Sequence, residues 1–487
     1  MRRILVIDQY VFGKLVSKMQ SGKLAAYVGA GFSSPSGLAD WSELMKPLAK
    51  SIELEVTKNS DYMSLAQYFV DAHGRNDLDD ILRNTFGKGN TCKNQESLAQ
   101  LNLSEIWTTN YDDLIERALR KCGKGYDVKS KESDLVLDAG KGTVPVYKIH
   151  GDYRNPSECI LTQRDYEDFF KNRKNFIHTL KSSLMQKTFI FVGFSFKDVD
   201  IKYILSDLRF SLNGGSTQTH YWITRKDPKW DKNEKNNYKL FSKSLKQNYN
   251  IETIEIEEYD DIPILFQNLQ KYSKRKRIFI SGAYCQENDE DDLQYENRRR
   301  SIDHFIEKLA SNIVDKENVI VSGYGLGVGS AVISGALRRG YEKYDCQKSS
   351  SYLSLHPFPQ NVVDDTKRKQ LWSDYRDEMC EESGVQIILF GKKKNKESGQ
   401  IVDSDGVRDE FSKAHSKGLF IIPVGSTEGV AQTIYKEMST KLDTFEYSSI
   451  TLKEKFKQLE TLSYKDNCDE LINVIMGILE EIQEYKD

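Results

Sequence analysis

Four short motifs in the first half of the chain carry residue types suited to binding and cleaving a nucleotide. They are Gly29-Ala30-Gly31-Phe32-Ser33, Asn110-Tyr111-Asp112, His150-Gly151 and Gly193-Phe194-Ser195. Glycines let a backbone approach a pyrophosphate, and exposed N–H groups of such a loop bind its oxygens. An amide orients water, and an imidazole accepts a proton near neutral pH. Each motif also has a plainer explanation: the glycines serve packing, Asn110 or Asp112 caps a helix, and His150 is a hydrogen-bonded turn residue.

A second glycine-rich turn, followed by scattered charges, marks the other half of the chain. The candidate ligand-binding residues there are Ser281, Gly282, Gly323, Gly325, Leu326, Gly327, Arg376, Lys393 and Glu410. Arginine and lysine pair with phosphates, and a carboxylate holds ribose hydroxyls. Taken singly, the glycines are explained by close packing and the charges by an ordinary surface. Lys393 lies between two other lysines, so the sequence leaves open which of the three contacts a ligand.

The elements that must position these motifs form an α/β pattern, because short apolar strands alternate with helical segments. In the first half, the predicted strands cover residues 25–28, 103–109, 144–149, 188–194, 220–224 and 251–256, with helices over 42–51 and 111–122. In the second half, the predicted strands cover 277–281, 318–322, 385–390 and 419–424, with helices over 293–314 and 452–485. The carboxyl ends of parallel strands face one crevice, so each half is expected to gather its motifs there.

A basic run over residues 271–277 predicts the domain boundary. We interpret this run as a solvated linker rather than a nucleic-acid patch. The chain then consists of two Rossmann-like parallel-sheet domains, residues 1–272 and 273–487. The segment 225–250, which is rich in lysine and asparagine, is expected to be a surface excursion.

Composition excludes several classes of protein. The 487 residues include 70 Lys and Arg against 73 Asp and Glu, a formal net charge of −3, which does not indicate a dedicated nucleic-acid binder. Seven scattered cysteines fit reduced thiols in a cytosol better than disulfides or a zinc knuckle. No stretch approaches the roughly 18 apolar residues of a membrane span, and the initial apolar run ends at Asp8, too early for a signal peptide. We therefore expect a cytoplasmic protein.

Together, the motifs of the first half resemble the NAD site of the sirtuin family in order and setting. Gly29 to Ser33, with Ser36-Gly37-Leu38-Ala39-Asp40-Trp41, is similar to the NAD-binding loop, and Thr109 to Asp112 to the motif beside the nicotinamide and ribose. His150-Gly151 resembles the catalytic pair, and Gly193 to Ser195 the contact with adenosine. The resemblance implies that Asn110 and His150 are catalytic, and that NAD is held by Gly29, Ala30, Gly31, Phe32, Ser33, Asp40, Asp112, Gly193 and Ser195.

One departure from the sirtuin pattern narrows the expected chemistry. Zinc-binding sirtuins carry two cysteine pairs after the His-Gly motif, whereas Cys159 is the only cysteine between Cys122 and Cys285. The resemblance therefore implies no zinc lobe and no metal. Because that lobe helps to form the acyl-lysine cleft of deacylases, we expect cleavage of NAD to ADP-ribose and nicotinamide, with water as acceptor. Asn110 would orient water or polarise the ribose, and His150 would accept a proton.

The motifs of the second half resemble the SLOG domain, a Rossmann-like sensor of nucleotides. A sirtuin-like half followed by a SLOG half resembles the effectors of the bacterial Thoeris anti-phage defence system, over nearly the whole chain. That resemblance implies activation by a cyclic ADP-ribose isomer, made by a partner with a TIR domain and bound through Arg376, Lys393 and Glu410. It also implies a homotetramer, filaments on activation and depletion of cellular NAD, without nucleic-acid or membrane partners.

Two other functions remain open at this stage. The first is an NAD-dependent protein deacylase with a regulatory nucleotide-binding domain, which requires an acyl-lysine groove. The second is a non-enzymatic nucleotide sensor or scaffold, against which the presence of both Asn110 and His150 argues.

Overall fold

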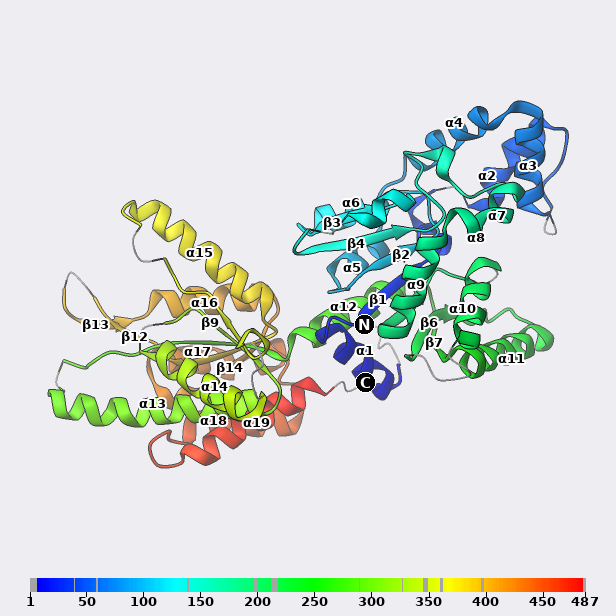
Figure 1. The fold of residues 1–487 in the computed structure, drawn as a ribbon. Helices are drawn as coiled ribbons and strands as arrows, with labels where there is room; N and C mark the ends of the chain where they lie inside the picture. Colours follow the sequence, from blue (N-terminus) through cyan, green and yellow to red (C-terminus); the bar gives the residue numbers. More distant parts are fainter. Residues whose placement is uncertain are drawn as a thin grey trace. The chain divides into compact units, whose positions relative to one another are not determined.

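The computed structural model describes residues 7–484, apart from positions 39, 58–59, 138–139, 197–198, 212–217, 289, 326, 345–348, 360–361 and 396–397. The chain divides into two compact units, Met1–Gln270 and Lys271–Lys486. Each unit is built on a parallel sheet with covering helices (Figure 1), so the predicted two-part α/β architecture is confirmed. Among the described residues, no helix is long and apolar enough to cross a membrane.

The sheet of the first unit has seven parallel strands in the order β3-β4-β2-β1-β5-β6-β7. Their bounds are β1 Leu24–Val28, β2 Ile106–Thr108, β3 Gly125–Lys129, β4 Thr143–Lys148, β5 Thr188–Val192, β6 His220–Arg225 and β7 Ile251–Ile256. Every residue of β1 and β5 is buried, as expected for apolar strands covered on both faces. The chain adds strands on one side of β1 before β5 and on the other side afterwards. The carboxyl end of β1 is therefore the switch point, where ligands bind in such sheets.

Helices surround this sheet and also form a group beside it. They are α1 Gln9–Gln20, α2 Trp41–Ser51, α3 Tyr62–His73, α4 Arg75–Phe86, α5 Lys93–Gln100, α6 Leu114–Lys121, α7 Gln163–Glu167, α8 Phe169–Asn172, α9 Lys174–Gln186, α10 Val199–Ser211, α11 Lys232–Tyr249 and α12 Asp261–Lys274. Short 3₁₀ turns are η1 Ala30–Phe32, η2 Ser34–Ser36, η3 Glu132–Val136 and η4 Pro156–Glu158. Helices α2, α3 and α4 lie together (Figure 1) and share an apolar core of their own.

The expectation that residues 225–250 form a surface excursion is wrong. Most of the segment is helix α11, whose first turn is capped by the Asp231 carboxylate. Tyr238 and Leu245 are buried in the core of this unit. Two apolar residues seven positions apart lie on one face of a helix and can anchor it. The many lysines and asparagines around them concealed this pattern.

The second unit has a five-stranded parallel sheet in the order β10-β9-β8-β11-β14 and a small antiparallel hairpin of β12 and β13. The strands are β8 Arg277–Ala283, β9 Val319–Ser322, β10 Leu353–Leu355, β11 Val385–Phe390, β12 Lys392–Lys394, β13 Ile401–Asp403 and β14 Phe420–Pro423. The helices are α13 Asp292–Asp315, α14 Val328–Tyr344, α15 Asp365–Glu382, α16 Asp405–Ser416, α17 Gly429–Ser439, α18 Ile450–Thr461 and α19 Cys468–Gln483, with 3₁₀ turns η5 Ser349–Ser351, η6 Gly425–Thr427 and η7 Leu442–Phe445. Strand order reverses between β8 and β11, which places the switch point of this sheet at their carboxyl ends.

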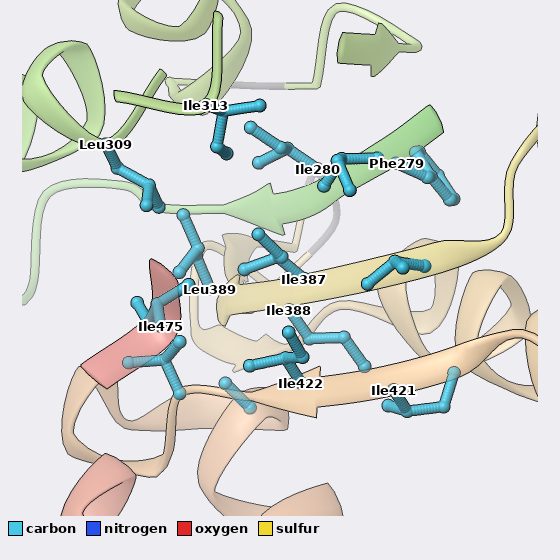
Figure 2. Packing of buried hydrophobic residues seen from close by; sticks show 14 of the residues in the cluster. Phe279, Ile280, Leu309, Ile313, Ile387, Ile388, Leu389, Ile421, Ile422 and Ile475 are labelled. Carbon is cyan, nitrogen blue, oxygen red and sulfur yellow. The ribbon is translucent and has the colours of Figure 1, made fainter. Parts of the chain in front are cut away.

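Branched aliphatic side chains fill the core of the second unit. Figure 2 shows Ile280 of β8, Ile387 of β11 and Ile422 of β14 on successive strands. Leu309 of α13 and Ile475 of α19 belong to the same buried cluster. Such side chains pack closely on a pleated surface, so this core holds the strand ends that carry the candidate ligand-binding residues.

The basic run over residues 271–277 is not a solvated linker. Helix α12 continues to Lys274, and β8 begins at Arg277. Arg275 is buried, and its guanidinium donates to the Glu446 carboxylate at 2.8 Å and to a backbone carbonyl. The prediction failed because a guanidinium can be buried when its N–H donors have hydrogen-bond partners. A run of charged residues therefore does not by itself indicate a solvent-exposed segment.

Gln386 is a buried amide in β11, and we expect its replacement to stabilise the second unit. Neither Oε1 nor Nε2 has a hydrogen-bond partner within the described part of the chain, and the side chain is fully buried. An unpaired buried polar group costs about 1–3 kcal/mol. Gln386→Met keeps the volume without the polar atoms, so the thermal midpoint should rise by about 2–12 °C. Ile388→Met, on the same face of the strand, is the control and should bring no gain; an unchanged midpoint for Gln386→Met would contradict the prediction.

Candidate functional site

The glycine loop after β1 packs directly on the turn after β5. The Gly29 N–H donates to the Val192 carbonyl and the Gly31 N–H to the Gly193 carbonyl, each at 3.0 Å. A Cβ on Gly29 would lie 2.4 Å from the Gly193 oxygen, and Gly193 itself has a φ of +63°. A larger residue at either position would separate the two loops. Packing of one loop on the other therefore requires these glycines.

The same loop does not present a row of free N–H groups. Residues 30–32 form η1, and the N–H groups of Phe32 and Ser33 donate back to loop carbonyls at 3.0 and 3.1 Å. Gly29 and Gly31 already donate to the β5 strand end and turn. In this conformation four of the five N–H groups of residues 29–33 can bind a pyrophosphate only by sharing or exchanging these hydrogen bonds, and the Ala30 N–H makes no hydrogen bond within the described part of the chain.

Asn110 follows β2, and its amide lies against the glycine loop. The side-chain Nδ2 donates to the Gly29 carbonyl at 3.3 Å and to the Ser33 Oγ at 3.1 Å. The residue is 6% exposed, and its Oδ1 has no hydrogen-bond partner among the residues that the structure describes. The structure thus brings Asn110 and the glycine loop together at the switch point and leaves one amide acceptor available.

Asp112, two residues further on, has the capping role offered for it, and its predicted contact with NAD stays a prediction. Its carboxylate accepts the Leu114 N–H at 3.1 Å and so caps the start of α6. Burial raises the pKa of Asp112, although Lys148 and Ser33 act in the opposite direction.

His150 lies just beyond β4 and is only 3% exposed. Its Nε2 is 3.3 Å from the Oδ2 of Asp200, a buried residue in the first turn of α10. The rings of Tyr166 and Phe169 meet the imidazole edge to face, with centroids 5.7 and 5.8 Å away. Asp200 is not among the predicted site residues, and its only signal in the sequence is a carboxylate in the first turn of the helix after Ser195.

Four further residues are predicted to contact NAD, and they differ in their exposure. Ala30 and Ser195 are exposed on their loops, whereas Phe32 is buried. Asp40 is exposed at the start of α2, where its carboxylate accepts the Glu43 N–H at 2.8 Å in a capping box. The structure gives Asp40 a role in starting a helix, and its predicted contact with NAD stays a prediction.

A fully buried lysine, which the sequence analysis did not single out, joins two of these loops. Lys148, the last residue of β4, donates to the carbonyls of Tyr111, at 3.1 Å, and Asp112. Its Nζ also lies 2.7 Å from Asp152 and 3.2 Å from Glu116. Burial alone lowers the pKa of Lys148, but the neighbouring carboxylates raise it above its usual value. The lysine therefore fastens the loop after β2 to the strand that leads to the His-Gly motif.

Removing this cation is expected to destabilise the first unit. Lys148→Met leaves two buried carboxylates without their central partner, which costs about 3–5 kcal/mol. The thermal midpoint should fall by about 6–20 °C. The control is Arg154→Met, because Arg154 binds Asp152 at 2.6 Å from a position 42% exposed and should matter less. Equal midpoints for the two variants would contradict this account of Lys148.

In the second unit, three of the predicted residues, one each from β8, α15 and α16, lie in contact. Glu410 is buried, and its Oε2 accepts the Ser281 hydroxyl at 2.5 Å. Its Oε1 lies 3.4 Å from the Nε of Arg376. Arg376 also pairs with Asp409 at 3.4 Å and stands 5.1 Å from the centre of the Phe358 ring. Burial raises the pKa of Glu410, against the effect of Ser281 and Arg376.

The predicted glycines of this unit lie where backbones and rings approach closely. A Cβ on Gly282 would lie 2.4 Å from a β11 carbonyl oxygen, and one on Gly325 would lie 2.7 Å from the Gly282 oxygen. Gly323 and Gly327 each face an aromatic ring at 2.7 Å by the same measure. Leu326 lies outside the described residues. Packing alone thus explains these four glycines, whichever ligand the turn binds.

Neighbouring lysines of β12 pair with different elements. The Nζ of Lys393 pairs with Asp405, the first residue of the helix that carries Glu410. The Nζ of Lys392 instead lies 3.4 Å from Glu287, in the loop after β8. Lys393 is therefore paired with the helix that carries Glu410, and its predicted contact with a ligand stays a prediction.

Known families match both units of the chain. Residues 261–482 match the Sir2- and TIR-associating SLOG family, and residues 104–254 match the SIR2-like domain. Defense-associated sirtuin 2 of Bacillus subtilis is 28% identical over 229 residues, which cover 45% of this chain and 22% of that protein.

Two relatives align with almost the whole chain. NAD(+) hydrolase ThsA of Cytobacillus dafuensis is 36% identical over 479 residues, covering 96% of this chain and 95% of the relative. NAD(+) hydrolase ThsA of Enterococcus faecium is 33% identical over 497 residues, covering 98% and 100%. The resemblance drawn from the two motif sets is confirmed, and the chain belongs to the ThsA family of NAD(+) hydrolases.

Proposed function

We propose that the SIR2-like unit of this chain hydrolyses NAD⁺ to ADP-ribose and nicotinamide. The observation that carries the proposal is the site at the switch point, where Asn110 turns an unpartnered, buried Oδ1 away from the glycine loop. His150 follows β4, the strand beside β2, so the two residues stand at neighbouring strand ends. Relatives that span almost the whole chain are named NAD(+) hydrolases, which favours water as the acceptor.

The residues of the site supply a simple mechanism. The bond between the nicotinamide nitrogen and the ribose C1′ breaks, its electron pair stays on that nitrogen, and a water oxygen bonds to C1′. Asn110 Oδ1 accepts a hydrogen bond from the water or from a ribose hydroxyl, and His150 takes the proton that water releases. Asp200, at 3.3 Å from the imidazole, stabilises the imidazolium that forms. One proton accompanies the ADP-ribose and nicotinamide.

A second part of the proposal is control by a cyclic ADP-ribose isomer bound to the SLOG unit. Arg376 would bind a phosphate, Glu410 a ribose hydroxyl, and Lys393 a further phosphate oxygen. At rest, Arg376 is held by Glu410 and Asp409, so an anionic ligand would compete for the guanidinium. The ligand can activate only through a higher affinity for the active state. The internally bonded glycine loop is consistent with a resting enzyme.

The setting proposed for this switch is defence against phage. A TIR-domain protein of the same system would make the ligand on infection, in keeping with the family description that pairs Sir2, TIR and SLOG. The chain would then deplete NAD in the cytoplasm, as a homotetramer that forms filaments when activated, and would need no metal, nucleic acid or membrane.

The acceptor in the reaction distinguishes the proposed hydrolase from a deacylase. The full chain is incubated with NAD⁺ and a cyclic ADP-ribose isomer, with and without an acetylated peptide, and the products are separated. We expect equal amounts of nicotinamide and ADP-ribose, independent of the peptide. Loss of NAD⁺ only when the peptide is present, with transfer of its acetyl group, would overturn the proposal in favour of deacylation.

A further inference from the structure

The orientation of the Asn110 amide decides what it can offer a substrate. An amide has two N–H donors on nitrogen and an acceptor oxygen. Both donors of Asn110 are directed at the protein, one at the Gly29 carbonyl and one at the Ser33 Oγ. The atom left for a reacting group is Oδ1, which accepts from O–H groups. A flipped amide would present N–H donors instead, which can donate to a hydroxyl oxygen but cannot accept the hydrogen of a ribose hydroxyl or of water.

The Ser33 hydroxyl is what holds this orientation. Its oxygen accepts from Asn110 at 3.1 Å and from the Nε2 of Gln95 at 3.4 Å. A hydroxyl has a single hydrogen. Because Asn110 and Gln95 both donate to the Ser33 oxygen, we assign that hydrogen to the side of the Asp112 carboxylate, whose pKa the Ser33 side chain lowers. If Ser33 gave that hydrogen to Asn110 instead, the amide would have to turn its oxygen toward the loop.

Gln95 comes from α5, outside every motif of the predicted site, and it is fully buried. Its Oε1 accepts the Cys92 N–H at 3.0 Å, the Cys92 thiol at 2.8 Å and the Ser36 hydroxyl at 3.4 Å. These donors fix which end of the amide is oxygen. The Nε2 must therefore face the glycine loop, where it reaches the Phe32 carbonyl at 3.5 Å and Ser33.

We propose that Gln95 is a positioning residue for the reaction: by donating to Ser33 it directs the serine hydrogen to Asp112, and so keeps the Asn110 carbonyl turned toward the substrate. This inference rests on the proposed NAD⁺ hydrolysis. Gln95 itself does not touch the reacting atoms, since its hydrogen bonds are with Phe32, Ser33, Ser36 and Cys92.

The test compares two neighbouring amides of α5. Asn94 is also buried and donates to the Phe32 carbonyl at 3.2 Å, so it supports the same loop backbone without binding Ser33. With the full chain and a saturating activating nucleotide, Gln95→Met should lower kcat about 10- to 100-fold, as expected for a misplaced catalytic group, with little change in KM. Asn94→Leu should lower kcat less than about threefold. Gln95→Glu, which keeps the size and the acceptor, serves if the Met variant does not fold and should show the same loss.

A double substitution separates this relay from general loop packing. In the Ser33→Ala background, Gln95→Met should cause no further loss of kcat, because the relay is already broken. Multiplicative losses, or wild-type kcat in both Gln95 variants, would overturn the inference while the hydrolase assignment stands. A wild-type protein that leaves NAD⁺ intact with every nucleotide tested would overturn the hydrolase assignment and this inference together.

Discussion

His150→Ala is expected to lower the rate of NAD⁺ hydrolysis by about 10²–10⁴-fold, because a general base contributes a factor of this size. His150 is buried at the switch-point edge with Asp200 as its partner, so another side chain or bulk water does not readily replace it. Initial rates of nicotinamide release, measured with saturating activating nucleotide, check this. Asn110→Ala should cause a similar loss, since it removes the available acceptor Oδ1.

The matched control for this variant is His178→Ala. His178 lies exposed on α9 of the same unit, away from the described contacts of His150. It should keep the wild-type rate. Circular dichroism should show that His150→Ala is folded, because the expected loss concerns the chemistry. A folded His150→Ala protein with wild-type turnover would remove His150 from the mechanism.

Arg376→Ala is expected to abolish activation at nucleotide concentrations that saturate the wild type, while leaving the SIR2-like unit unchanged. A shift from about 1% to about 99% active requires roughly 5.5 kcal/mol of preference for the active state. A charge-assisted contact of a guanidinium with a phosphate is among the strongest contributions available. The concentration of nucleotide for half-maximal NAD⁺ hydrolysis should therefore rise by about 100-fold or more. Arg376→Lys should restore only part of the response to nucleotide, because lysine lacks the planar pair of donors.

Arg408 provides the control in the same unit. It lies on α16, as Glu410 does, but it is 44% exposed and pairs with Glu437 at 2.8 Å. Arg408→Ala should respond to nucleotide as the wild type does. If Arg376→Ala responds at the wild-type concentration, the nucleotide binds elsewhere in the chain.

Much of the fold follows from the apolar pattern of the sequence. The bounds of β7 and β11 agree with prediction, because each is a short apolar or alternating run with clear ends. The strands β3 and β10 were missed: one is Gly-Tyr-Asp-Val-Lys and the other has three residues, so neither shows a strong apolar period. Helix α11 was missed because its composition is dominated by lysine and asparagine.

Part of the candidate site could also be predicted, because it depends on which residues end the strands. Asn110 and His150 stand at strand ends, where sequence position alone places them at one edge of a parallel sheet. Asp200, Lys148 and Gln95 were not found, because a buried polar residue shows its role only through its partners. Those partners come from elements that are distant in sequence, and no spacing rule connects them.

NAD⁺ consumption by the full chain, with and without a panel of cyclic ADP-ribose isomers, tests the central claim most directly. We expect little loss of NAD⁺ without nucleotide and rapid release of nicotinamide and ADP-ribose with at least one isomer. Equal rates with and without every isomer would contradict control through the SLOG unit, and intact NAD⁺ under all conditions would contradict the hydrolase itself.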